Sequence, residues 1–169
     1  MELGVVAAIP KMNIEFDFDQ EFRATLESGD PHSETYVRLY DATGDNILKS
    51  LVGTPELLVS VASFINELLR CASKLQSGSQ GTLSLYLENK EVVLSPSGAD
   101  KVAVQATDCA SNERREAVHI GTDAFIFEVE TVAREFLDIA GQANENLAED
   151  PALIRIQERF ESLRNHSPT

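Results

Sequence analysis

Residues 82–107 read TLSLYLENKEVVLSPSGADKVAVQAT, and this stretch decides the class of the fold. It contains three short, strand-like apolar segments separated by polar residues, and Asn89-Lys90 is a tight-turn candidate between the first two. A fourth short strand is expected at 117–120. Strands with such short connections pair with their neighbours along the chain, so the stretch predicts an antiparallel meander. The three segments are 82–88, 91–96 and 101–107.

Three more strands are expected in the first third of the chain. The segments 12–19 (MNIEFDFD) and 35–41 (TYVRLYD) alternate apolar and polar residues, which indicates two strands with one apolar side each. Between them, residues 20–33 end in the turn-forming sequence SGDPHS. Residues 47–52 (ILKSLV) follow the turn-forming ATGDN and are predicted to be the hairpin partner of 35–41.

Capping signals and a period near 3.6 residues predict three helices. Thr54 is a suitable N-cap before Pro55, which is favoured at the first helical position. Asp150 and Pro151 repeat this signal, and Gly141 is well placed to end the middle helix. The three predicted helices are 55–76, 122–141 and 151–164.

The resulting order, β-β-β-α-β-β-β-β-α-α, predicts an α+β fold in which about three helices pack on one antiparallel, twisted sheet. A length of 169 residues suits one domain. We assign residues 12–165 to that domain. Residues 1–11 are interpreted as a flexible N-terminal arm or a non-native start, and residues 166–169 as a disordered tail.

The charge balance limits the class of partner. Asp and Glu number 28 against 14 Lys and Arg, for a net charge of −14. This excess argues against nucleic acid and anionic membranes, and it favours fast association with a basic protein, with plain solubility as the alternative. No segment reaches the roughly 18 consecutive apolar residues of a membrane helix. Residues 3–10 lack the basic flank of a signal peptide, so we expect a cytoplasmic protein.

Motifs for chemistry are missing. The segment GSQGT at 78–82 has no phosphate-binding lysine, and an EF-hand beginning at Asp17 would need Gly and Glu where Phe22 and Ser28 stand. A lone strand histidine, His119, is expected to be a surface or packing residue. We therefore predict no catalytic residue, no metal site and no cofactor.

The two cysteines are far apart and belong to no CxxC motif. Cys71 falls within an apolar helical pattern and is expected to be buried, whereas Cys109 lies in the polar stretch TDCASNE and is expected to be more exposed. We predict two reduced thiols rather than a disulfide.

The alternating strands also define a candidate partner-binding surface on their polar side. Acidic side chains supply long-range steering, and Tyr and Arg are favoured at interface hot spots. The alternative is that the acids merely face water while Tyr36 and Tyr40 pack in the core. The candidate residues are Glu15, Asp17, Asp19, Glu34, Tyr36, Arg38 and Tyr40.

The succession IEFDFDQEF, ETYVRLYD, TPELLVSVASFINELL, a meander and FIFEVETVAREFL resembles the small acidic immunity proteins of bacterial polymorphic-toxin and contact-dependent inhibition systems. The resemblance covers architecture and charge over the whole chain, and it implies stoichiometric neutralisation of a basic cognate toxin without catalysis. The alternatives are a secretion-type chaperone, an accessory subunit of a larger complex, or an enzyme without a recognisable motif. A secretion-type chaperone is disfavoured because this chain begins with a strand rather than an amphipathic helix. The oligomeric state stays open.

Overall fold

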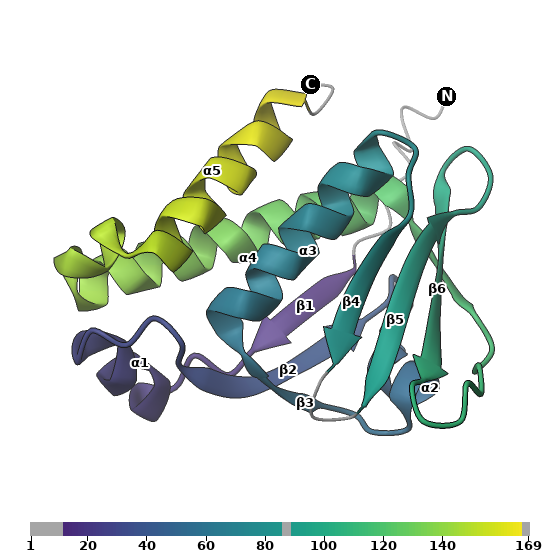
Figure 1. The fold of residues 1–169 in the computed structure, drawn as a ribbon, viewed down its shortest axis with the longest axis horizontal. Helices are drawn as coiled ribbons and strands as arrows, with labels where there is room; N and C mark the ends of the chain where they lie inside the picture. Colours follow the sequence, from purple (N-terminus) through teal and green to yellow (C-terminus); the bar gives the residue numbers. More distant parts are fainter. Residues whose placement is uncertain (1–11, 86–88, 167–169) are drawn as a thin grey trace, which may run out of the picture.

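A computed structural model describes residues 12–85 and 89–166 of the chain (Figure 1). The combination of helices with antiparallel strands confirms the predicted α+β class. The predicted arm (1–11) and residues 167–169 of the predicted tail lie outside the described residues, whereas His166 ends a helix. The elements, in chain order, are β1 (Asn13–Phe16), α1 (Gln20–Glu27), β2 (Glu34–Tyr40), α2 (Ile47–Val52), β3 (Leu57–Ser60), α3 (Val61–Gln76), β4 (Gly81–Leu85), β5 (Lys90–Pro96), β6 (Lys101–Asp108), β7 (Val118–Gly121), α4 (Thr122–Ala143), the 3-10 helix η2 (Glu145–Glu149) and α5 (Pro151–His166).

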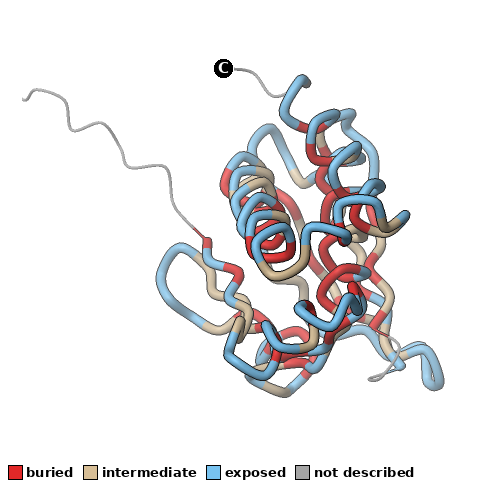
Figure 2. The backbone as a smooth tube through the Cα atoms, turned by 90° about the vertical axis from the view of Figure 1, so that its left-hand side faces the viewer, coloured by how far each residue is buried: buried red, intermediate tan, exposed pale blue. Residues whose placement is uncertain are grey.

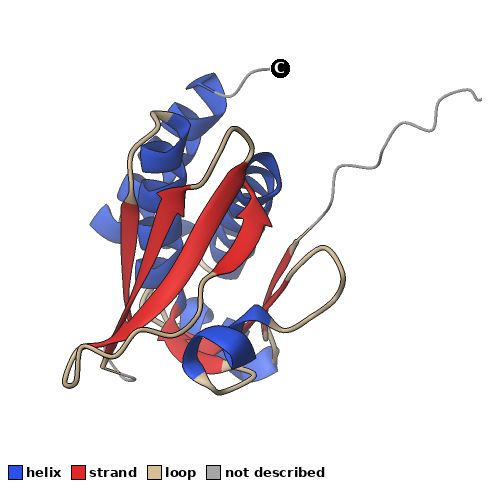
Figure 3. Ribbon diagram, turned by 90° about the vertical axis from the view of Figure 1, so that its right-hand side faces the viewer, coloured by secondary structure: helices blue, strands red, loops and turns tan. Residues whose placement is uncertain are grey.

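The strands form two antiparallel sheets, so the expectation of a single sheet is wrong. β1, β2 and β3 make one sheet, and β4 to β7 make the other, in which each strand pairs with the next as the meander predicts. Figure 3 shows this larger sheet in front of the long helices. The sheets stay separate because α3 follows β3, and its Arg70 donates to the Thr82 carbonyl at 2.9 Å, on the edge of β4.

The segment 47–52, predicted to be a hairpin strand, is helix α2. Asn46 caps its N-terminus by accepting a hydrogen bond from the Lys49 backbone at 2.9 Å. Gly53 ends it in the left-handed conformation, with φ 86°. The apolar pairs in ILKSLV therefore all become buried on one side of a short helix, an outcome that a period-two pattern does not describe.

The third strand of this sheet is formed instead by residues that were predicted to begin a helix. Leu57–Ser60 form β3, which pairs with the edge of β2, and α3 begins only at Val61. Thr54 caps no helix; its hydroxyl donates to the Glu56 carbonyl at 3.2 Å. Pairing with an existing strand outweighs the local helix signal here, because the pairing buries Leu57 in the core.

With α1 and α2, the described residues contain five α-helices rather than about three. The strand predicted at 12–19 ends at Phe16, and Asp19 becomes the N-cap of α1. The Asp19 carboxylate accepts a hydrogen bond from the Phe22 backbone at 2.9 Å. Asp19 is therefore a helix cap and not part of the polar side of a strand.

Asp19→Ala should lower the free energy of unfolding by about 1 kcal/mol, because the cap that satisfies the Phe22 N–H is lost. Chemical denaturation of the purified protein measures this change. The matched control is Glu21→Ala, an exposed acid in the first turn of the same helix, for which about 0.3 kcal/mol is expected from the helix dipole alone. Equal effects of the two substitutions would contradict the assigned cap.

The two C-terminal helices follow the sequence signals closely. α5 begins at Pro151, and Asp150 accepts a hydrogen bond from the Ala152 backbone at 2.8 Å, as the capping signal predicts. α4 runs past Gly141 to Ala143, so the predicted helix end at Gly141 is wrong. The chain leaves the helix at Asn144, whose side-chain amide donates to the Glu27 carbonyl of α1.

One hydrophobic core joins both sheets and the helices. α3 lies at its centre and packs against α4, α5, β3, β4 and β5 (Figure 1). In Figure 2 the buried positions follow the inward sides of the helices and strands, with exposed positions outside. One face of the three-stranded sheet covers an end of this core, and the opposite face of the sheet is turned toward solvent.

Candidate functional site

The candidate surface lies on the outer face of the three-stranded sheet, which we define by Glu15, Glu34, Tyr36, Arg38, Tyr40 and Leu58. Directly opposed residues of an antiparallel pair project to the same side. Glu15 opposes Arg38, and Tyr36 opposes Leu58. Because side chains two residues apart also share a side, the alternation in β2 adds the remaining members. The parity predicted from sequence is thus present in the sheet.

The two sides of β2 differ in exposure as that parity requires. Val37 is fully buried, whereas Tyr36 is 45% exposed. Arg38 and Tyr40 are half-buried, and Glu34 is exposed. The alternative in which Tyr36 packs in the core is therefore wrong.

Arg38 organises the acids around it. Its guanidinium donates to both carboxylate oxygens of Asp17, at 2.5 and 3.3 Å, and to Glu56 at 2.9 Å. The Arg38 side chain is 26% exposed, so these ion pairs lie at the surface and orient the carboxylates more than they stabilise the fold. Two carboxylates pair with one guanidinium, and Glu15 lies opposite Arg38 in the strand register, so acids are in excess on this face.

Of the seven candidate residues, Asp19 does not belong to this face, because its carboxylate caps α1. Asp17 follows the end of β1, but its ion pair with Arg38 keeps it beside the face. Reversing the charges of Glu15, Asp17 and Asp19 together would therefore disturb the fold as well as the surface. Glu15 and Glu34 are the acids whose side chains can be changed independently of these structural contacts.

Two acids near this surface were missed by sequence reasoning. Glu56 was assigned to a helix, although it pairs with Arg38 from the chain just before β3. Glu128 of α4 accepts a hydrogen bond from the Ile14 backbone at 2.6 Å, across 114 residues. Burial raises the pKa of Glu128, opposed by that hydrogen bond and reinforced by the nearby charges of Glu135 and Glu15. No local sequence pattern predicts either contact.

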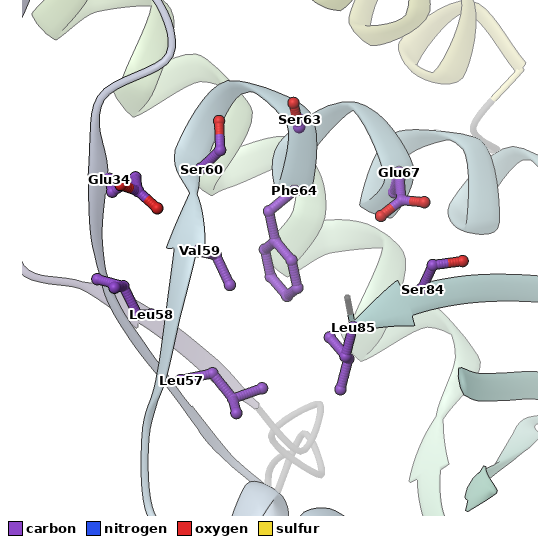
Figure 4. Close-up of a pocket in the computed structure, with 10 residues that line it drawn as sticks. All are labelled: Glu34, Leu57, Leu58, Val59, Ser60, Ser63, Phe64, Glu67, Ser84 and Leu85. Atoms are coloured by element: carbon purple, nitrogen blue, oxygen red, sulfur yellow. The ribbon is translucent and has the colours of Figure 1, made fainter. Parts of the chain in front are cut away.

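A cavity of about 260 Å³ lies between the two sheets, beside β3. In Figure 4, Glu34 of β2 and Glu67 of α3 lie on opposite sides of it, and Phe64 points into the space between β3 and β4. Burial raises the pKa of Glu67, against the opposing effects of Arg70 and of the Ser84 N–H that Glu67 accepts. The apolar lining of the cavity consists of Leu57, Leu58, Val59, Phe64 and Leu85.

The two cysteines and His119 belong to other elements than the three-stranded sheet. Cys71 is buried, which raises the pKa of its thiol to about 12, and Cys109 is exposed; both are free, as predicted. His119 is exposed on β7. Within residues 12–85 and 89–166, no three His, Cys, Asp or Glu side chains are grouped so that they could hold a metal ion.

Every helix in the described part of the chain is too short or too polar to cross a membrane. In comparisons with known proteins, the chain matches no family model, no curated protein and no solved structure.

Proposed function

We propose that this protein is an immunity-type binding domain that neutralises a basic cognate toxin by stoichiometric binding. The observation that carries the proposal is the outer face, where acids in excess over Arg38 share one side of the sheet with the exposed Tyr36. This combination suits an interface, because acids attract a basic partner and an exposed aromatic ring contributes contact area.

The arrangement around Arg38 supports binding in a second way. Asp17 and Glu56 are held in position by ion pairs before any partner arrives. A surface that is already ordered loses less side-chain entropy on association than a mobile one. The net charge of −14 adds long-range attraction for a basic protein, which acts mainly on the association rate.

The test uses the product of the neighbouring gene. We expect this gene to encode a toxin domain whose expression arrests bacterial growth, and co-expression of the present protein to restore growth through a one-to-one complex. Growth arrest that the present protein does not relieve, or the absence of a complex between the purified proteins, would refute the proposed function.

The surface assignment is tested by the double variant Glu15→Gln with Glu34→Gln. Its association rate with that toxin at low salt should fall by at least about threefold, because steering by two acids is lost. The control is Glu91→Gln with Glu116→Gln, which removes the same charge from exposed positions outside the three-stranded sheet. Stopped-flow fluorescence measures both rates, and equal losses would assign the effect to net charge rather than to the outer face.

A further inference from the structure

Among residues 12–85 and 89–166, β3 pairs with β2 along one edge, and no strand pairs with its other edge. The Val61 N–H donates to the Ser33 carbonyl at 3.1 Å, which identifies that opposed pair as a hydrogen-bonded one. Hydrogen-bonded pairs alternate along an antiparallel ladder. The N–H and C=O of Leu58 and the N–H of Ser60 therefore point away from β2, on the side where the cavity lies.

Two other sheet edges carry partners for such groups. On β1, the Ile14 N–H donates to Glu128, and the Phe16 carbonyl accepts from the Phe18 backbone. On β4, the outward groups of Thr82 and Ser84 bind Arg70 and Glu67 of α3. Covering of this kind protects an edge strand from pairing with another chain. Among the described residues, no hydrogen bond covers the outward groups of β3.

The surroundings of β3 are suited to an added strand. Leu58, directly on the edge, is 38% exposed, and Tyr36 beside it is 45% exposed. The Ser60 hydroxyl oxygen, in the cavity wall, is buried without a hydrogen-bond partner among the described residues. β7 is the remaining edge strand, and the backbone groups of His119 point away from β6 there. The cavity, however, lies beside β3. The edge, the apolar cavity and the acids at its sides thus occur together.

We propose that the edge of β3 binds an extended segment of the partner by β-strand addition, with apolar side chains entering the cavity and Lys or Arg side chains meeting Glu34 and the other acids of the outer face. The two side-chain sets follow from the alternation of a strand, which turns successive residues to opposite faces. Main-chain hydrogen bonds to Leu58 and Ser60 supply affinity, and the cavity and acids supply selectivity. This inference rests on the proposed function for the identity of the partner as a basic toxin.

The first test uses a fluorescent eight-residue peptide of alternating lysine and valine. We expect saturable binding by fluorescence anisotropy, and no binding of the matched glutamate–valine peptide. Leu58→Pro removes an outward N–H at an edge position where proline is tolerated, and it should weaken binding of the lysine peptide at least tenfold. Leu58→Ala, which keeps the N–H, should weaken it much less. Absence of saturable lysine-peptide binding, or equal affinities of the two variants, would overturn the proposal.

A second measurement serves if Leu58→Pro fails to fold. In the unaltered protein, saturation with the lysine peptide should slow hydrogen exchange of the Leu58 and Ser60 amides at least tenfold, while amides of β6 stay unchanged. Unchanged exchange at both positions would overturn strand addition.

Failure of the two proposals can be told apart. If the toxin is neutralised equally by Leu58→Pro and Leu58→Ala, the edge of β3 is not the binding site, while the proposed function stands. If the peptide results hold but the neighbouring toxin is not bound, the edge is a site for a different basic segment and the proposed function fails.

Discussion

Phe136→Ala should lower the free energy of unfolding by about 3–5 kcal/mol, the largest effect expected of any single substitution considered for this protein. Phe136 of α4 is fully buried, and its ring lies 6.5 Å from that of Phe22 in α1. Removing the ring leaves a cavity where α1 meets α4, which the surrounding helices can close only in part. Urea denaturation followed by circular dichroism measures the change.

The same helix offers a matched control. Phe127→Ala removes an identical side chain that is 63% exposed, so stability should change by no more than about 0.5 kcal/mol. A loss at Phe136 as small as that at Phe127 would mean that α4 is not packed as the structure shows.

Gly81→Ala should lower the free energy of unfolding by about 1–3 kcal/mol, a large effect for the addition of one methyl group. Gly81 opens β4 where that strand crosses α3. A Cβ atom there would lie 2.9 Å from both the Cα and the Sγ of Cys71. The Cys71 backbone belongs to α3, so relief requires the helix or the strand to move. Thermal and urea unfolding measure the loss.

Gly141→Ala is the control for this substitution. A Cβ at Gly141 meets nothing within 4 Å, and the residue lies inside α4. Alanine is favoured over glycine in a helix, so stability should rise by about 0.5–1 kcal/mol. Opposite signs at the two glycines are expected, and a neutral Gly81→Ala would contradict the close approach of β4 to α3.

Much of the fold follows from local patterns. The meander from β4 to β7 was predictable because short, strand-like apolar segments follow one another along the chain with no helical pattern between them. The start of α5 was predictable from Asp150 and Pro151, since a cap signal acts within one turn of the chain. The sides of β1 and β2 followed from parity alone, because strand side chains alternate whatever the strand pairs with.

Local patterns failed where two structures were both locally reasonable. ILKSLV at 47–52 suits a strand, yet the caps Asn46 and Gly53 make it helix α2. Thr54-Pro55-Glu56 suits a helix start, yet Leu57–Ser60 pair with the edge of β2 and form β3. The division into two sheets follows from this exchange, because the chain enters α3 directly from β3.

The sequence by itself determined the α+β class, the acidic charge and the side of the strands on which Glu15, Tyr36 and Arg38 lie, since these depend on composition and on neighbours along the chain. Only the tertiary structure decided that Arg38 pairs with Asp17 and Glu56 and that the edge of β3 away from β2 lies beside a cavity. Such contacts join residues far apart in the sequence. They depend on how helices and sheets pack, which no local period records.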